Sequence, residues 1–306
     1  MKFSSIIELL KQFHNEEACL EYLKQARWAE GEYCPHCGHR KIYTFKDGKS
    51  YKCAECRKRF SIKVGTIFED SKIPLQTWFM AIYLITSHSK GISSVQLSKD
   101  LNVTQKTAWF ILHRLRHASN TNAFNQPLKN TVEADETYIG GKEKNKHKSK
   151  RTPNTQGRNT KTKIAVVGMI ERGGNVKAFK VETVNSETIQ TSVLQNVLIG
   201  SRLMTDEFHS YKRLGSFYIH NSVSHGAGQY VNGDAHTNTI EGFWSIFKRG
   251  LIGIYHFISK KHIDKYLSEF AYRYNTRDMG ASDKFKMLID NSICRLTYNQ
   301  LIGKTA

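Results

Sequence analysis

The chain shows two kinds of hydrophobic periodicity, and each kind occupies its own part of the sequence. Over residues 4–26 and 75–117, apolar side chains recur three or four positions apart, which predicts amphipathic helices. Asn15 is placed to cap the second of the early helices. The later helical pattern breaks at Asn102 and resumes at Thr104. The first 120 residues are therefore predicted to contain a group of short helices.

From residue 131 onward the pattern changes to the alternation expected of β-strands. The predicted strands are five segments, of which the second and third form a hairpin: 131–139, 162–170, 175–184, 201–207 and 216–225. Helices are predicted between Ser186 and Leu198, from Thr237, and over 260–277. A hairpin followed by a helix and a further strand predicts an α/β fold, in which helices cover a mixed sheet.

The composition favours a polyanionic partner for a globular chain. The 306 residues include 46 Lys and Arg against 27 Asp and Glu, which gives a net charge of +19. Nucleic acid is the commonest partner of so basic a chain. No apolar run approaches the ~18 residues that cross a membrane, and the polar start MKFSSIIELLKQFHNEE does not resemble a signal peptide. We therefore expect a cytoplasmic, nucleoid-associated protein without a membrane partner.

Four of the six cysteines form two CxxC pairs, Cys34 with Cys37 and Cys53 with Cys56. Fifteen residues separate the pairs, and this spacing is typical of a four-thiolate zinc site. The intervening residues alternate in character around a turn at Asp47, which predicts a β-hairpin. We therefore expect a zinc ribbon that holds one structural Zn²⁺, with a pair of disulfides as the rival arrangement.

The helical segment before the sheet has the layout of a helix-turn-helix. One short helix ends before the break at Asn102, and a second begins at Thr104. Gln105, Lys106 and Thr107 lie in the first turn of the second helix, where base edges are met in a major groove. Three-helix bundles without DNA contacts share this pattern, but the basicity of the chain favours DNA binding.

Residues 236–248, HTNTIEGFWSIFK, predict an amphipathic helix with chemistry on its polar face. At helical spacing the polar face carries Asn238, Glu241, Ser245 and Lys248. The opposite face carries Ile240, Phe243, Trp244 and Phe247. Upstream, Asp135 lies within one predicted strand and Asp206 ends another. Two strand-borne aspartates and one helix-borne glutamate are the oxygen ligands that a pair of hard divalent cations needs, which predicts a site for Mg²⁺ or Mn²⁺.

Further acidic residues adjoin the proposed ligands. Glu133 and Glu136 flank Asp135, and alternation along the strand is expected to turn both to the opposite face. Glu207 stands in the same relation to Asp206. We therefore expect none of these flanking glutamates to join the ligand set.

Residues 142–163 form a basic insertion between the first two predicted strands. They hold nine Lys or Arg and a single acid, Glu143. Their content of Pro, Asn, Thr and Ser disfavours a packed element. Such runs are often only solvated, but beside a site for phosphate chemistry we expect a flexible arm that clamps the DNA backbone.

These motifs, taken in order, resemble a known family. The zinc ribbon, the helix-turn-helix-like segment, VEADETYIGGK, TDEFHSY and HTNTIEGFWSIFKRGLIGIYHFISKKHIDKYLSEFAYRYNTR together resemble bacterial insertion-sequence transposases of the DDE group with an N-terminal zinc ribbon. The last block is the most specific part. The resemblance covers nearly the whole chain and implies an RNase H-like, integrase-like catalytic domain.

The resemblance and the changes in composition together predict the domain organisation. The polar residues 119–130 mark the boundary before the catalytic domain. The expected parts are an N-terminal helical segment, a zinc ribbon, a helix-turn-helix-like DNA-binding module, an RNase H-like catalytic domain and a C-terminal tail: 1–26, 27–70, 71–120, 128–280 with the basic insertion 142–163, and 281–306.

The resemblance also implies roles for single residues. Asp135, Asp206 and Glu241 would be the catalytic, metal-binding acids. Lys248 would contact DNA near the scissile end, and the same block supplies further expected DNA contacts: Arg249, Tyr255, His256 and Lys260. Some family members use asparagine as the third ligand. We favour Glu241 because a carboxylate binds Mg²⁺ more strongly than a neutral amide, and we expect Asn238 to orient a metal-bound water.

The implied reaction is phosphoryl transfer on double-stranded DNA with two divalent cations. A first step would free a 3′ hydroxyl at each transposon end, and that hydroxyl would then attack target DNA. Two ends acting together imply a homodimer or higher oligomer, while the ribbon and helix-turn-helix modules would recognise the terminal inverted repeats. Two alternatives stay open: a DNA-binding regulator that descends from such an enzyme and no longer cuts, and an RNase H-like nuclease without strand transfer.

Overall fold

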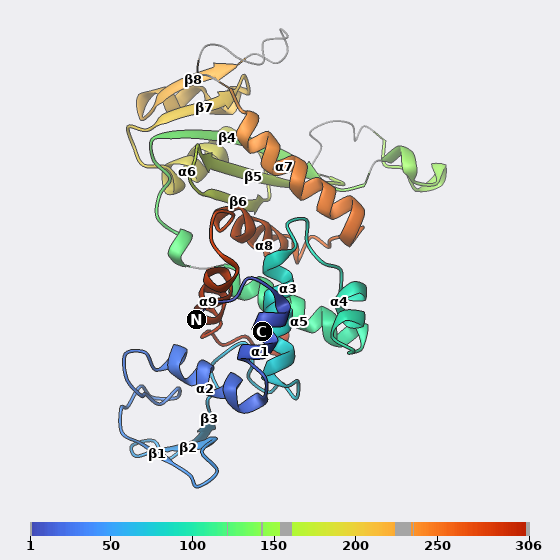
Figure 1. Cartoon of the computed structure of the whole chain (residues 1–306). Coiled ribbons are helices and arrows are strands. Elements are labelled where there is room, and N and C mark those ends of the chain that lie inside the picture. Colours follow the sequence, from blue (N-terminus) through green and yellow to red (C-terminus); the bar gives the residue numbers. More distant parts are fainter. Residues whose placement is uncertain are drawn as a thin grey trace. The chain divides into compact units, whose positions relative to one another are not determined.

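The chain divides into two compact units (Figure 1). The computed structural model describes residues 2–120, 122–141, 143–153, 161–223, 234 and 236–303. One unit joins residues 1–120 to residues 276–306, and the other consists of residues 121–275. Each unit has buried apolar side chains of its own.

The first unit is built on short helices, most of which begin at a local capping residue. Its helices are α1 (Ile6–Gln12), α2 (Glu16–Arg27), α3 (Leu75–Ser87), α4 (Ser94–Asp100), α5 (Gln105–Ala118), α9 (Ala281–Asn291) and α10 (Tyr298–Ile302). Asn15 caps α2 as predicted, because its side chain accepts a hydrogen bond from the amide of Ala18 at 2.9 Å. Such caps satisfy N–H groups that the first turn of a helix leaves without a helical partner.

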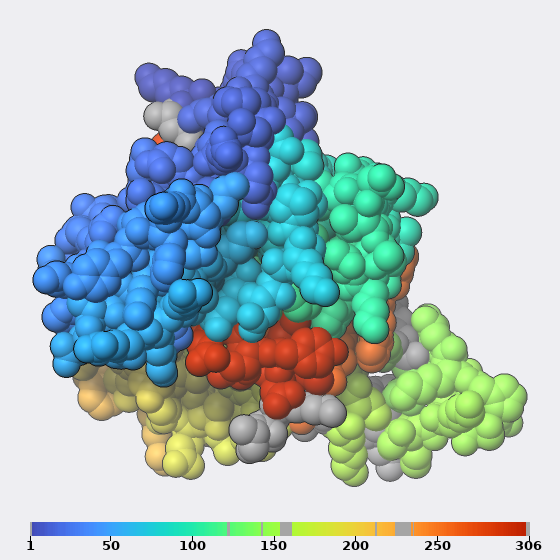
Figure 2. All heavy atoms as spheres, turned by 90° about the horizontal axis from the view of Figure 1, so that it is seen from below, coloured from blue at the N-terminus to red at the C-terminus, as the bar shows by residue number. Residues whose placement is uncertain are grey.

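An aromatic cluster joins the helices of the first unit. The rings of Phe13, Tyr22, Phe79 and Phe285 have centroids 4.8 to 6.1 Å apart. Phe285 belongs to α9, so the residues expected to form a C-terminal tail instead contribute to this core. Figure 2 shows the red C-terminal residues beside the cyan residues of the same unit. The physical reason is the helical spacing of Phe285, Leu288 and Ile289, which buries one face of α9.

A small antiparallel sheet carries the cysteine pairs. Its strands are β1 (Ile42–Thr44), β2 (Ser50–Cys53) and β3 (Arg59–Ser61), with β2 in the centre. The predicted turn is present, because Asp47 accepts hydrogen bonds from the amides of Lys49 and Ser50, both at 3.0 Å. Gly48 follows with φ of 64°, a left-handed conformation that glycine adopts without a steric penalty.

The second unit contains a five-stranded mixed sheet. Its strands are β4 (Thr131–Ile139), β5 (Ile164–Glu171), β6 (Val176–Val181), β7 (Arg202–Asp206) and β8 (Ile219–Val223). They lie in the order β6-β5-β4-β7-β8. β4, β5 and β6 pair antiparallel, whereas β4, β7 and β8 pair parallel. All five predicted strands are therefore present, and the predicted mixed sheet is confirmed.

Helices cover both faces of this sheet, as Figure 1 shows. α6 (Ser186–Asn196) packs on the face that carries Val132 and Ala134. α7 (Asn238–Gly250) and α8 (Ile263–Asn275) share a core with Ile139 on the other face. The alternation of β4 thus separates two apolar layers, with even-numbered residues toward α6 and odd-numbered residues toward α7. The longest described helix, α5, has 14 residues, and no described helix is long and apolar enough to cross a membrane.

The described part of the basic insertion stands away from the sheet. Residues 143–153 contain two short 3₁₀ turns, Glu143–Asn145 and Lys148–Lys150, and are drawn in yellow-green in Figures 1 and 2. Most of their side chains are exposed. Residues 142 and 154–160 of the predicted arm lie outside the described residues.

Candidate active site and zinc centre

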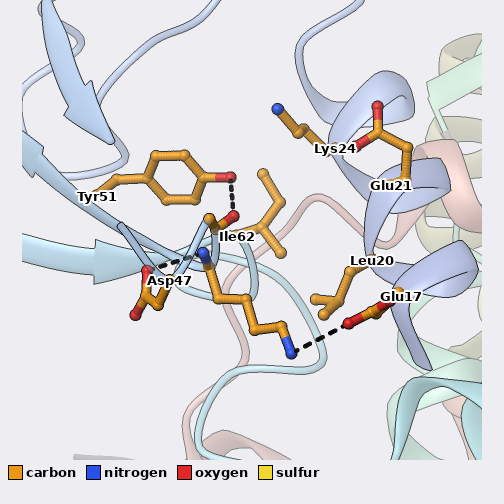
Figure 3. Close-up of a pocket in the computed structure, with 9 residues that line it drawn as sticks. Glu17, Leu20, Glu21, Lys24, Asp47, Tyr51 and Ile62 are labelled. Carbon is orange, nitrogen blue, oxygen red and sulfur yellow. Dashed lines mark hydrogen bonds and ion pairs between the residues drawn. The ribbon is translucent and has the colours of Figure 1, made fainter. Parts of the chain in front are cut away.

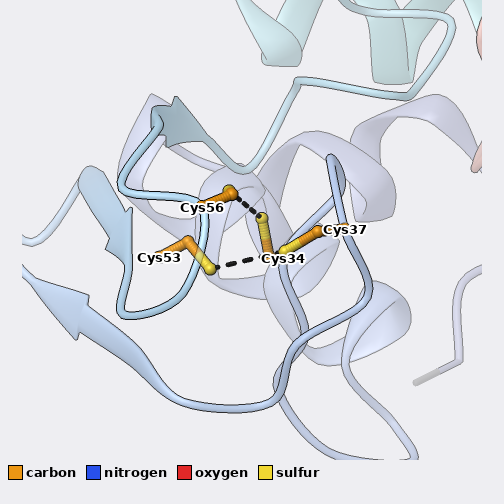
Figure 4. Close-up of side chains that lie close together, drawn as sticks. All are labelled: Cys34, Cys37, Cys53 and Cys56. Atoms are coloured by element: carbon orange, nitrogen blue, oxygen red, sulfur yellow. Dashed lines mark hydrogen bonds between the residues drawn. The ribbon is translucent and has the colours of Figure 1, made fainter.

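The two CxxC pairs bring four sulfur atoms together (Figure 4). All four Sγ atoms lie within 4.8 Å of one another, and every cysteine in the group is a free thiol. Cys34 Sγ is 3.7 Å from Cys56 Sγ, and Cys37 Sγ is 3.5 Å from Cys53 Sγ. Thiolates gathered in this way fit one tetrahedral Zn²⁺ and close its coordination shell, which is typical of a structural site.

The backbone conformation and hydrogen bonds of the CxxC turns favour metal binding. The residue after each pair, Gly38 and Arg57, has a positive φ, of 77° and 60°. Although burial acts to raise it, the pKa of Cys53 falls to about 6, because the amides of Cys56 and Glu55 and neighbouring sulfurs donate hydrogen bonds to it. A thiol that ionises near neutral pH is a ready zinc ligand.

Replacing Cys53 by serine, or chelating zinc, is expected to unfold the ribbon and leave the sheet of the second unit folded. The small core around Tyr51 and Phe60 is too limited to fold without the metal. Hydrogen exchange should show lost protection over 34–61 and unchanged protection over 131–139. The variant Cys294→Ser serves as the control, since Cys294 lies outside the cluster. Loss of protection throughout the chain would contradict an independent ribbon.

A pocket between α2 and the ribbon carries charges of both signs (Figure 3). Glu17, Glu21, Lys24 and Asp47 line it. Lys49 Nζ lies 3.9 Å from a carboxylate oxygen of Glu17. Acidic and basic side chains both line this pocket, so its charge favours neither an anion nor a cation as a ligand.

The predicted helix-turn-helix geometry is present in α4 and α5. Asn102, with φ of 51°, forms the turn between them, and Thr104 caps α5 through the amide of Thr107 at 3.2 Å. Gln105 and Lys106 are exposed in the first turn of α5. The side chain of Gln105 donates a hydrogen bond to Ser94 at 2.7 Å, which ties the two helices together. DNA contact by these residues stays a prediction.

Two of the three predicted catalytic acids stand on neighbouring strands at the same level of the sheet. Asp135 lies in the middle of β4, and Asp206 is the last residue of β7. Two residues before each aspartate, Glu133 pairs with Met204 in the parallel ladder. This register sets Asp135 beside Asp206.

The third acid comes from α7. The exposed side of this helix carries Asn238, Glu241, Ser245 and Lys248, and the buried side carries Ile240, Phe243, Trp244 and Phe247. The predicted division of the helix is thus confirmed. The hydroxyl of Thr237, just before the helix, donates a hydrogen bond to Glu241 Oε1 at 2.8 Å. Asn238 is the first residue of α7, and its part in metal binding stays a prediction.

The acids are close enough to influence one another's ionisation. Burial is the largest cause of the raised pKa of Asp135, which reaches about 7. The charges of neighbouring acids raise it as well: Glu136, Asp206 and Glu241. Like charges that share one site need protons or cations to compensate them. This donor set therefore fits divalent cations, with Asp135, Asp206 and Glu241 as the candidate ligands.

The predicted orientation of Glu133, away from the face of Asp135, is wrong. Glu133 lies two positions from Asp135, so alternation keeps both on the face toward α7, whereas Glu136 does turn away and accepts a hydrogen bond from Tyr211. Glu133 is fully buried. Its carboxylate accepts hydrogen bonds from the amides of Thr239 and Ile240, at 2.8 and 3.0 Å, and from the Thr239 hydroxyl at 2.8 Å.

Glu133, on a strand far away in the sequence, therefore caps the N-terminus of α7. An N-cap residue normally accepts from the second or third amide of its helix, and those amides belong to Thr239 and Ile240. The local cap residue, Thr237, makes no such bond. Its hydroxyl is instead directed to Glu241. Negative charge at this end also interacts favourably with the helix dipole.

Arg172 binds both Glu133 and the residues just before α7. Its Nε donates to Glu133 at 2.7 Å, and its two Nη atoms donate to the carbonyls of Asp234 and His236 at 2.9 and 3.0 Å. His236 Nδ1 also lies 3.3 Å from Glu133 Oε1. One ion pair thus holds β4, the β5–β6 turn and the entry to α7 in a fixed arrangement, which fixes Glu241 relative to Asp135.

Two protein-family models match parts of this chain. Residues 127–275 match the family model described as the ISXO2-like transposase domain. The matched range includes β4, β7 and α7, and therefore all three acids. Residues 14–59 match the transposase zinc-ribbon domain, and that range includes all four clustered cysteines.

A curated relative extends the similarity beyond these two matched ranges. It is an uncharacterized protein in the transposable element ISH50 of Halobacterium salinarum, 28% identical over 296 residues. The similarity covers 93% of this chain and 99% of the relative. Because that host is an archaeon, the expected resemblance to bacterial elements is not confined to bacteria.

Solved structures give a weaker likeness. The Mos1 strand transfer complex has a TM-score of 0.27 and 14% identity, over 70% of this chain and 78% of that chain. A pre-cleavage Mos1 transpososome has a TM-score of 0.27 and 12% identity, over 71% and 79%. These values are too low to support a statement about fold or function.

The basic and aromatic residues that follow Glu241 within the matched range 127–275 differ in their surroundings. Lys248, Arg249 and His256 are exposed. Lys260 is exposed too, and it forms an ion pair with Glu182 at 2.8 Å. Tyr255 instead packs into the domain, where its hydroxyl donates to Glu269 at 2.8 Å. The structure therefore gives Tyr255 a packing role in addition to its predicted DNA contact.

Replacing Gly168 by alanine is expected to displace α7. Gly168 pairs with Asp135 across the sheet, and a Cβ there would lie 2.4 Å from Trp244 Cζ2 and 3.1 Å from Ile240 Cδ1. Overpacking of this kind costs about 1–3 kcal/mol, so thermal denaturation should occur at lower temperature. Gly242→Ala is the matched control on α7, because nothing lies within 4 Å of its added Cβ. That variant should gain stability through helix propensity, and an equal loss in both would contradict the packing argument.

Proposed function

We propose that this chain is a DNA transposase that cuts and joins DNA strands by metal-dependent phosphoryl transfer. The proposal is carried by the parallel register that sets Asp135 beside Asp206, with Glu241 near enough to raise the pKa of Asp135, all within the range 127–275 that matches the ISXO2-like transposase domain. The match to a transposase zinc ribbon and the net charge of +19 support the same function. The mixed sheet with helices on both faces agrees with an RNase H-like catalytic domain, which we include in the proposal.

The three acids would hold the cations that this reaction needs. When bound, two Mg²⁺ or Mn²⁺ ions lower the pKa of an attacking water and neutralise charge on the leaving oxygen. Asp135 and Asp206 supply rigid ligands because both belong to paired strands. Glu241 is oriented by the hydrogen bond from Thr237. The protein therefore contributes oxygen ligands at fixed positions and needs no nucleophilic side chain.

The remaining parts would bind the DNA. Exposed cations on and after α7 would contact phosphates next to the scissile bond: Lys248, Arg249 and Lys260. Gln105, Lys106 and Thr107 would read base edges at the transposon ends. Two ends are joined in one reaction, so we propose a homodimer or higher oligomer as the active assembly.

Cleavage and strand transfer by the wild-type protein and Asp135→Asn test the proposed function. The substrate is labelled duplex DNA that carries the sequences flanking the gene, with Mg²⁺ and an unlabelled target duplex. We expect the wild type to free and join 3′ ends, and Asp135→Asn to bind the same DNA without cutting it. Asparagine keeps the size of the side chain and removes the charge that holds the cation.

The other outcomes decide between the remaining functions. A wild-type protein that binds these ends and never cuts them with Mg²⁺ or Mn²⁺ would be a DNA-binding regulator. Cutting without joining would identify an RNase H-like nuclease. Equal cutting by wild type and Asp135→Asn would show that the acids are not the catalytic site.

Replacing Lys144, Lys148 and Lys150 by glutamine is expected to flatten the salt dependence of DNA binding. The three side chains are exposed in the basic insertion. Each lost phosphate contact should reduce the slope of log affinity against log salt concentration by about 0.9. Titrations by fluorescence anisotropy at several salt concentrations measure this slope. Lys146→Gln is a useful comparison because Lys146 is paired with Glu143 at 2.6 Å. A slope equal to that of the wild type would show that the insertion does not contact DNA.

A further inference from the structure

The chain leaves α7 through a strained turn. A single turn of π-helix, Leu251–Tyr255, follows the last residue of α7. His256 then has φ of 57° and ψ of −43°, and the amide of Phe257 donates to the Tyr255 carbonyl at 2.6 Å. A hydrogen bond across one residue with positive φ defines a rare and strained γ-turn. Residues other than glycine keep such a conformation only where the surrounding structure enforces it.

Packed side chains hold the turn from both sides, a partly buried one before it and a buried one after it. Before it, the ring of Tyr255 lies edge-on to Tyr266 with centroids 4.9 Å apart, and its hydroxyl donates to Glu269. After it, Ile258 is buried in the core beneath α7 and α8. The two residues between these anchors, His256 and Phe257, are both exposed. The turn is thus a rigid support that directs an aromatic side chain outward.

Phe257 is the most exposed of the large hydrophobic side chains in the part of the chain that the structure describes. It is 78% exposed, and Ile252 on the preceding turn is 70% exposed. The segment 248–261 that contains both has four cations and no acid: Lys248, Arg249, Lys260 and Lys261. Lys260 is paired with Glu182, which leaves three cations of this segment for a ligand. An aromatic ring held in solvent within a segment whose charged residues are all basic is complementary to a ligand that has both phosphates and flat aromatic faces.

We propose that the ring of Phe257 stacks on an unpaired base of the bound DNA. This inference rests on the proposed function. Stacking on aromatic side chains beside a basic surface is how proteins hold bases without reading their edges. Bases inside a duplex cover one another's faces, so the partner is a base in a single-stranded end or at an opened step. Phe257 continues the chain segment that carries Glu241, and the stacked base therefore belongs to DNA bound by the catalytic domain.

A binding experiment with two DNA forms tests this proposal. The probes are a fluorescein-labelled blunt duplex and the same duplex with a four-nucleotide single-stranded 3′ overhang, measured by anisotropy without added divalent cation. Phe257→Ala is expected to weaken binding of the overhang duplex by about 5- to 150-fold, the contribution of one stacked base. Binding of the blunt duplex should change much less. Phe257→Trp should restore the preference for the overhang, because an indole also stacks.

Ile252→Ala is the matched control, since it removes an almost equally exposed apolar side chain that has no ring. It should lower both affinities equally or not at all. Unchanged binding by Phe257→Ala, or full rescue by Phe257→Leu, would overturn stacking while leaving the transposase proposal intact. A loss of self-association in Phe257→Ala by sedimentation, with DNA affinity unchanged, would assign the side chain to a second copy of the chain and would also overturn it. Failure of the wild type to bind either duplex would overturn both proposals.

Discussion

Glu241→Gln is expected to abolish DNA cleavage and strand transfer while leaving DNA binding in place. Glutamine keeps the length of the side chain and can still accept the hydrogen bond from Thr237. It removes the negative charge that would hold a cation opposite Asp135 and Asp206. The loss should reach about 10²- to 10³-fold or more, since a metal ion supplies several kcal/mol of charge stabilisation in the transition state. Single-turnover cleavage with Mg²⁺ measures it, and anisotropy with the same DNA measures binding.

The variant Asn238→Ala decides which residue of α7 is the third ligand. Both side chains lie on the exposed face of the helix. If Glu241 is the ligand, Asn238→Ala should reduce cleavage far less than Glu241→Gln, because it removes only a group that orients water. A larger loss in Asn238→Ala would transfer the ligand role to the asparagine.

Glu133→Ala is expected to destabilise the catalytic domain by about 3–5 kcal/mol, the cost of breaking a buried ion pair from one side. The substitution would leave the amides of Thr239 and Ile240 without their acceptor and Arg172 without its partner. Glu133→Gln keeps an acceptor and should cost less. We expect it to fold and to lose about 10- to 100-fold in cleavage rate, as for residues that orient metal ligands. Urea unfolding and single-turnover cleavage measure the two effects.

Glu136→Gln separates positioning from general destabilisation. Glu136 is buried on the same strand as Glu133, but it faces Tyr211 on the other side of the sheet. Its removal should affect stability without moving α7. For each variant, the loss of cleavage rate is compared with the loss of stability. If this ratio is the same for Glu133→Gln and Glu136→Gln, then Glu133 is a structural residue only.

Much of this protein was predictable because the relevant signals are local. The two CxxC pairs predicted a zinc ribbon, since each pair needs only one turn to present two sulfurs. Period-2 alternation predicted each of the five strands of the sheet. Helical spacing divided α7 into an exposed face with Glu241 and a buried face with Trp244. In each case residues within a few positions of one another determine the structure.

Only the tertiary structure decided which distant residues meet. Parallel pairing of β4 with β7 sets Asp135 beside Asp206, and no local pattern specifies that register. Phe285 joins the aromatic core of the N-terminal helices, although the end of the chain read as a tail.

The role of Glu133 depended on the same long-range contacts. Alternation alone puts it on the face of Asp135, but its use as a cap follows from packing α7 against the sheet, 106 residues further along the chain. The sequence by itself determined the elements and the kinds of side chain they carry, because these depend on local periodicity. The tertiary structure decided which carboxylates lie side by side, which one caps α7 and which one faces Tyr211, because these positions depend on contacts between segments far apart in the chain.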